Sequence, residues 1–203
     1  KQKYTARIFD VTEDLSARAV IVTSSSLSAN ASESIAVVKE IARGTGSDDE
    51  VSDILIALTE GKETKLFAEN DVLKKSGGKK LKSGDIIQMK KNSAGKITSI
   101  RVLFDSENPK EEFVKSPAED LETVYGKVTK KFAASVNVSV NGESEVNYFV
   151  PENTVVYKVD TALSKNNVSV AKISDIQVFD SDDESRVFIK LYKNAVKEIV
   201  IVE

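Results

Sequence analysis

The residues best suited to binding an ion are the acidic side chains of one short segment. Asp180-Ser181-Asp182-Asp183-Glu184 places four carboxylates within five residues. Calcium takes about six to eight oxygen ligands, and alternate Asp side chains suit it. The segment lacks the glycine and the closing glutamate of an EF-hand loop. Two interpretations stay open: a calcium site with Asp180, Asp182 and Asp183 as its first ligands, or an acidic turn in contact with solvent. Calcium is the only cofactor that the sequence suggests.

The amino-acid composition excludes most of the usual catalytic groups. The chain has no His and no Cys, which rules out Cys- or His-ligated zinc, thiol nucleophiles and imidazole bases. No Gly-x-Ser-x-Gly sequence marks a nucleophilic serine, and Gly77-Gly78-Lys79-Lys80 lacks the spacing of a phosphate-binding loop. A carboxylate pair for glycoside hydrolysis leaves no sequence pattern because the fold assembles it. Since the acids of this chain cluster in loops, we predict that the protein is not an enzyme.

A run of lysines raises the question of nucleic-acid binding. Residues 74–82 contain five lysines, but no Arg and no aromatic residue interleaves them. Single-stranded nucleic acid needs aromatic side chains on which its bases can stack. The net charge of the chain is −3, which gives no overall attraction to phosphate. No apolar run approaches the roughly 20 residues of a membrane helix. We therefore expect no nucleic-acid partner and no membrane insertion.

Short alternating segments separated by turn residues predict an all-β fold. Asn141-Gly142 is the strongest hairpin signal, because both residue types tolerate the positive φ angles of a tight turn. Single strands are expected at residues 35–41, 123–130 and 154–159. The predicted hairpins join residues 4–11 to 17–23, 54–58 to 64–68, 85–90 to 96–104, 135–140 to 145–150, and 187–192 to 196–202.

The two halves of the chain resemble each other in sequence. Residues 37–41 match 124–128, the turn at Gly61 matches that at Gly142, and residues 87–92 match 189–194. A small sheet with two open edges invites aggregation, so closure into a barrel of OB or SH3 type is expected. The predicted organisation is a β-hairpin with a Ser-rich linker (1–34), two tandem small β-barrel-like modules (35–105 and 122–203), and a charged, Pro-containing linker between them (106–121).

Three strand-rich stretches, residues 9–18, 124–132 and 187–201, resemble the repeat-rich, non-anchoring regions of clostridial surface proteins that carry S-layer homology domains. The resemblance touches most of the chain, through strings of low specificity. The wall-anchoring motifs of the homology domains are not apparent in the sequence. The resemblance implies an extracellular location, at the cell surface or in the cell wall, and a structural role.

The function expected from the sequence is therefore a non-enzymatic structural and assembly segment of an S-layer-type protein. Its partners would be further copies of itself or other surface-layer proteins, while cell-wall polysaccharide would be bound by domains that this chain does not contain. Residues 17–23 resemble the closing strand of a barrel, and would complete a preceding repeat or add a strand to a neighbouring copy. Two alternatives stay open: an extracellular carbohydrate-binding module, and a viral or phage structural protein of similar tandem-barrel design.

Overall fold

The computed structural model describes residues 5–11, 17–23, 35–45, 51–116, 121–161, 167–178 and 185–203. These residues form strands, and no α-helix occurs among them. Two short 3₁₀ turns, Ser76–Gly78 and Ile173–Asp175, lie in the connections. The prediction of an all-β fold is confirmed.

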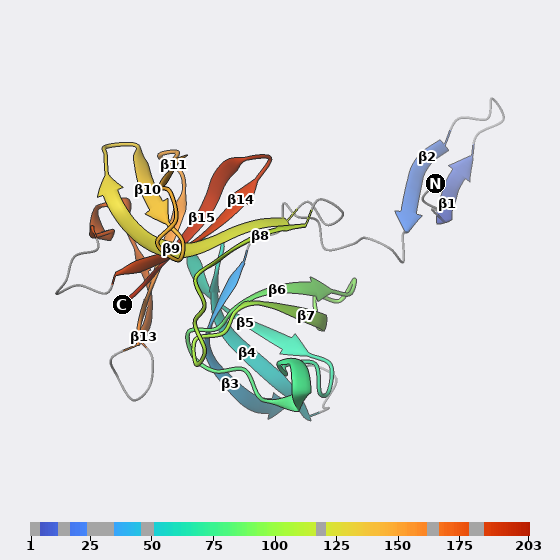
Figure 1. Cartoon of the computed structure of the whole chain (residues 1–203). Coiled ribbons are helices and arrows are strands. Elements are labelled where there is room, and N and C mark those ends of the chain that lie inside the picture. Colours follow the sequence, from blue (N-terminus) through green and yellow to red (C-terminus); the bar gives the residue numbers. More distant parts are fainter. Residues whose placement is uncertain are drawn as a thin grey trace. The chain divides into compact units, whose positions relative to one another are not determined.

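The chain divides into two compact units, Lys1–Asn30 and Ala31–Glu203. The first unit contains an antiparallel hairpin of β1 (Thr5–Val11) and β2 (Ala17–Thr23), in which Ile8 lies opposite Val20. The second unit contains all the other strands (Figure 1).

The first module of the second unit is a closed five-stranded barrel. Its strands follow the order β3-β4-β5-β7-β6, and β6 pairs back to β3. The barrel closes where β5 and β7 meet in parallel at Ala68 and Ile97. Its interior is filled by aliphatic residues such as Val38, Leu55 and Ile87, and the predicted first barrel is present. The strands are β3 (Ala36–Thr45), β4 (Val51–Thr59), β5 (Lys62–Ala68), β6 (Ile86–Lys91) and β7 (Ile97–Phe104).

The second module is an eight-stranded open sheet, and the expectation of a second closed barrel was wrong. Its path runs β11-β10-β9-β14-β15-β12-β13, and β8, which lies off this path, pairs with residues 121–125 of β9. The strands are β8 (Glu112–Ser116), β9 (Leu121–Lys131), β10 (Ser135–Ser139), β11 (Val146–Phe149), β12 (Val155–Asp160), β13 (Asn167–Ala171), β14 (Arg186–Tyr192) and β15 (Ala195–Val202).

The two modules nevertheless share one connectivity. In each, a long first strand (β3 or β9) pairs with a hairpin (β4–β5 or β10–β11) on one side. On its other side it pairs with the first strand of a closing hairpin (β6–β7 or β14–β15). The modules differ in the partner of the last strand of the closing hairpin. β15 pairs in parallel with β12, whereas β7 pairs in parallel with β5. The second module thus repeats the connectivity of the first, and its strands β11 and β15 lie next to each other without pairing.

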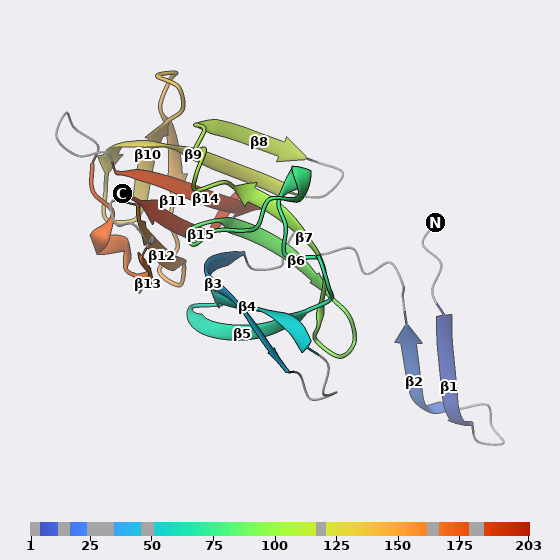
Figure 2. The same cartoon turned by 90° about the horizontal axis from the view of Figure 1, so that it is seen from below.

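The segment predicted as a linker takes part in the second sheet. Its residues Glu112–Ser116 form β8, which runs beside β9 (Figure 2). Glu111 accepts the backbone N–H of Asn141 at 2.8 Å and the Arg186 Nε–H at 3.1 Å. These bonds tie the start of β8 to the β10–β11 turn and to β14.

Candidate functional site

The acidic residues singled out as calcium ligands, Asp180, Asp182 and Asp183, lie outside the described residues. Among the residues that the structure does describe, no group of three or more Asp, Glu, His or Cys side chains is arranged to hold a metal ion.

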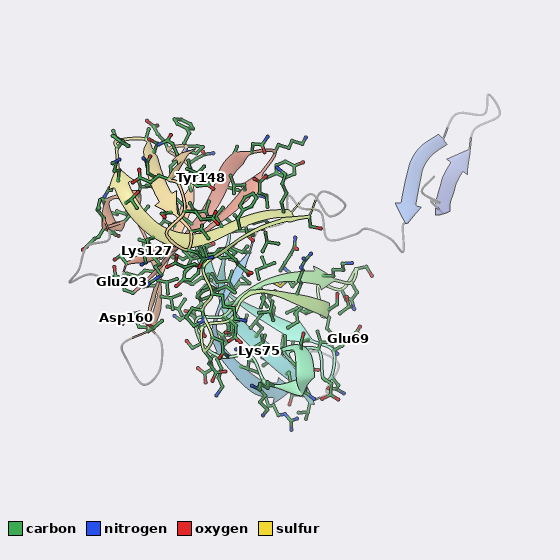
Figure 3. All side chains as sticks on the ribbon, viewed as in Figure 1. Glu69, Lys75, Lys127, Tyr148, Asp160 and Glu203 are labelled. Carbon is green, nitrogen blue, oxygen red and sulfur yellow. The ribbon has the colours of Figure 1, made fainter. Side chains whose placement is uncertain are left out.

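The most concentrated set of charges in the barrel surrounds Lys75 (Figure 3). Its Nζ lies 3.0 Å from Asp85 Oδ2 and 3.4 Å from Glu107 Oε2, and it donates a short hydrogen bond to Asp105. Asp85 is fully buried, and it also accepts hydrogen bonds from the backbone N–H groups of Lys82 and Ser106. The cluster therefore joins the loop before β6 to the chain that leaves β7.

The electrostatics of this cluster fit a structural role. Burial lowers the pKa of Lys75, but hydrogen bonds to Asp105 and Asp85 outweigh it, so the pKa is raised above its ordinary value. A nucleophilic or basic lysine needs the opposite shift, because only the neutral amine reacts. The Lys75 amine therefore stays protonated and forms ion pairs with Asp85, Asp105 and Glu107.

A second feature is an apolar core that the two modules share. The barrel contributes residues that include Ile35, Leu58 and Phe104, and the sheet contributes residues that include Tyr125 and Phe188. The rings of Phe104 and Tyr125 lie 4.7 Å apart between centroids, and those of Phe104 and Phe188 lie 6.2 Å apart. Tilted pairs at such distances add to the stabilisation from burial. We call this set of residues the shared core.

Tyr157 connects the shared core to the tip of a barrel hairpin. Its side chain is fully buried on β12, and its hydroxyl oxygen accepts the backbone N–H of Gly61 at 2.9 Å. Gly61 has φ +77° in the β4–β5 turn, a conformation that glycine adopts without steric cost. Burial raises the pKa of Tyr157 to about 12, so the hydroxyl remains neutral at physiological pH.

A buried pair of opposite charges lies beside Tyr157. Lys190 of β14 and Glu198 of β15 are cross-strand partners, with exposures of 0% and 1%. Glu198 Oε2 accepts the backbone N–H of Ile35 at 2.9 Å, directly before β3. Burial raises the pKa of Glu198, against the opposing effects of the Ile35 hydrogen bond and the Lys190 charge. The carboxylate thus links the sheet to the entry of the barrel.

The third feature is a groove beside the outer edge of β11. No described strand pairs with that edge, whereas β10 pairs along the other. A cavity of about 430 Å³ lies between this edge and the β14–β15 hairpin, lined by Val146 and Tyr148 of β11 and by Leu191 and Val196 of that hairpin. Val146 is 50% exposed and Phe149 66%, and Figure 3 labels Tyr148 on this part of the sheet. β15 lies beside this edge without pairing to it, so the groove is the opening between β11 and the closing hairpin of the second module.

An exposed polar and aromatic face also occurs on β9–β10–β11. Phe132 donates its backbone N–H to Ser135, and Ser135 lies opposite Phe149, so the three residues continue one cross-strand row. Two positions along the strands, and therefore on the same face, Asn147 donates its amide N–H to Asn137 at 2.6 Å. Phe132 is 53% exposed. The exposed rings of Phe132 and Phe149 thus lie on the same face as the hydrogen-bonded side-chain amides of Asn137 and Asn147.

Sequence reasoning missed the shared core, the buried charge pair and the β11 groove. Lys190 and Glu198 are charged residues in a strand, a pattern that normally indicates a solvent-facing side. Alternation along β14 and β15 places both residues on one face of the sheet. This shared placement is the only feature of the sequence that could have indicated the pair. The groove has no sequence pattern within any one segment, because residues from several strands that are far apart in the chain line it.

No family model, no curated protein and no solved structure matches this chain. No helix among the described residues has the length and apolar character needed to cross a membrane.

Proposed function

We propose that the chain is a non-enzymatic structural segment of a bacterial cell-surface protein of S-layer type. It holds two β-modules as one rigid body and assembles with neighbouring molecules through β-rich interfaces. The resemblance of residues 9–18, 124–132 and 187–201 to repeat regions of clostridial surface proteins supports the cell-surface location.

The observation that carries this proposal is the shared core. Tandem domains joined only by a linker move relative to one another by default. Here Phe104, Tyr125 and Phe188 pack in one cluster, and Tyr157 and Glu198 bond to the barrel backbone. A segment that fixes the spacing between neighbouring molecules of a layer needs such a rigid junction, because a flexible hinge would allow those distances to vary.

Distance measurement between spin labels tests the rigidity that the proposal requires. The chain has no Cys, so Ser93→Cys on the β6–β7 turn and Lys193→Cys on the β14–β15 turn give two unique, exposed label sites. We expect one narrow distance distribution. A broad or multimodal distribution would show independently moving modules and overturn the proposal.

A second candidate function, carbohydrate binding, is favoured by the face that carries Phe132 and Phe149. Exposed rings stack on sugar rings, and amides such as Asn147 hydrogen-bond to hydroxyl groups. Titration with soluble cell-wall polysaccharide, monitored by calorimetry, tests it. Saturable binding that is lost in Phe132→Ala would support this function, and the absence of heat with the parent chain would remove it.

A further inference from the structure

We propose that the cavity between β11 and the β14–β15 hairpin binds a small organic cation whose charge is carried by a quaternary ammonium group. The inference goes beyond the proposed function, because a structural segment needs no small-molecule site.

The walls of the cavity are largely apolar and come from facing strands of the second sheet. Val138 and Val146 are cross-strand partners on β10 and β11, and Leu191 of β14 lies opposite Glu122 of β9. Tyr148 packs against the apolar cluster that contains Val138 and Leu191. The volume of about 430 Å³ falls within the range of small-molecule sites. The cavity is therefore large enough for a ligand and offers it an apolar surface.

The charges of the cavity favour a cation. Among the described residues that line it, the charged side chains are two carboxylates, those of Glu122 and Glu143. The Glu122 side chain is only 18% exposed. Burial, together with the negative charge of Glu122, raises the pKa of the Tyr148 hydroxyl, so the carboxylate and the ring act on the same space. A negative charge in a partly dehydrated site attracts a cation more strongly than it would in water.

The aromatic side chains favour a quaternary ammonium group over a primary one. Phe113, Tyr148 and Phe149 line the cavity together. The face of an aromatic ring attracts a cation, and aromatic residues recognise quaternary ammonium groups in this way. A primary ammonium group donates three hydrogen bonds, which the aliphatic walls cannot accept. A quaternary group donates none, so it loses no hydrogen bond when it enters.

Lys115 competes for the same carboxylate from outside the cavity. Its Nζ lies 3.4 Å from Glu122 Oε2, and its side chain is half-exposed and does not line the cavity. An exposed ion pair of this kind contributes little to stability. A ligand cation held against the rings can therefore replace the Lys115 ammonium group beside Glu122.

Titration of the full chain with choline, followed by the NMR shifts of its backbone amides, tests the proposal. The control ligand is 3,3-dimethyl-1-butanol, which has the shape of choline but a carbon atom in place of the charged nitrogen. We expect saturable shifts in β11 and the β14–β15 hairpin with choline, and binding about tenfold weaker with the neutral alcohol. Equal affinities would mean that the cavity recognises only apolar shape, and would overturn the proposal. The absence of saturable shifts with choline would also overturn it.

Paired substitutions test which side chains bind the cation. Glu122→Gln and Phe113→Leu should each weaken choline binding by about fivefold or more. Their matched controls, Glu152→Gln and Phe132→Leu, change exposed residues that do not line the cavity, and should leave the affinity unchanged. Lys115→Met removes the competing cation and should tighten binding. Phe113 is 49% exposed, so its replacement leaves the core intact. Equal weakening in a variant and its control, or weaker binding in Lys115→Met, contradicts the inference.

Discussion

Glu198 of β15 accepts the backbone N–H of Ile35 at 2.9 Å, although the two residues are 163 positions apart. Ile35 stands at the entry of the barrel, and Glu198 lies in the last strand of the open sheet. The bond therefore fixes the orientation of β3 relative to the closing hairpin of the other module. A buried carboxylate in this role makes the junction between the modules sensitive to pH.

Replacing Glu198 with Gln should remove that sensitivity. Burial raises the pKa of Glu198 above 4.5 in the folded chain. Its contribution to stability is complete below the unfolded pKa and is lost as the pH rises through the raised folded pKa. Glu198→Gln keeps an oxygen that accepts from Ile35 but cannot ionise. Its free energy of unfolding should therefore improve relative to the parent as the pH rises above 4.5, the ordinary pKa of a Glu side chain.

Urea unfolding at a series of pH values measures this difference. Other carboxyl groups titrate equally in both proteins, so they cancel when the parent is subtracted. Parallel stability curves across the whole range would show that Glu198 is ionised in both the folded and the unfolded chain.

Tyr157→Phe should weaken the contact between β12 and the barrel turn. The variant retains the buried ring but leaves the Gly61 N–H without its acceptor, which costs about 1 kcal/mol at neutral pH. With a folded pKa of about 12 against 10.0 for the free side chain, the parent also loses stability as the pH rises from 10 to 12. The variant should lose less over that alkaline range.

Thermal unfolding at neutral and alkaline pH checks both effects. Tyr192→Phe is the matched control, because Tyr192 is only half-buried at the end of β14. The same change in both variants would mean that the Tyr157 hydroxyl has no special role.

Lys75→Met should destabilise the barrel strongly. The substitution leaves Asp85, which is 0% exposed, without its cation, and breaking a buried ion pair costs about 3–5 kcal/mol. Lys74→Met is a control at the adjacent residue. It breaks only the exposed pair with Asp71, for which about 0–1 kcal/mol is expected. The free energies of unfolding in urea should differ accordingly, and equal values would exclude a stabilising role for the buried cluster.

The sequence predicted the local pairings well because turn chemistry specifies them. Gly61, with φ +77°, and Asn141-Gly142, with φ +52° and +76°, lie in the turns where the hairpins were expected. β8 was missed because prolines and charges dominate its surroundings, although Phe113 and Val114 lie within it. The opening of the second barrel was missed for a different reason. It depends on a parallel pairing between Val155–Val159 and Glu198–Val202, and such a long-range choice leaves no pattern within either segment.

Gly126→Ala should disrupt the long first strand of the second module. A Cβ atom at this position would lie 2.3 Å from the carbonyl oxygen of Ser139 and 3.0 Å from Val138 Cγ1. Since the oxygen belongs to the backbone of β10, the clash can be relieved only by moving that strand away from β9. Overpacking of this kind costs about 1–3 kcal/mol or more.

Gly44→Ala is the appropriate control, because its added Cβ would meet only the flexible end of the Ile54 side chain. We expect Gly126→Ala to lower the free energy of unfolding by at least about 1 kcal/mol more than Gly44→Ala does. Hydrogen exchange should show the loss of protection concentrated in β9 and β10, while the amides of β3 and β4 retain theirs. If the barrel strands lost protection to the same degree, the two modules would unfold as one cooperative unit, and the shared core rather than the β9–β10 contact would set the stability of the chain.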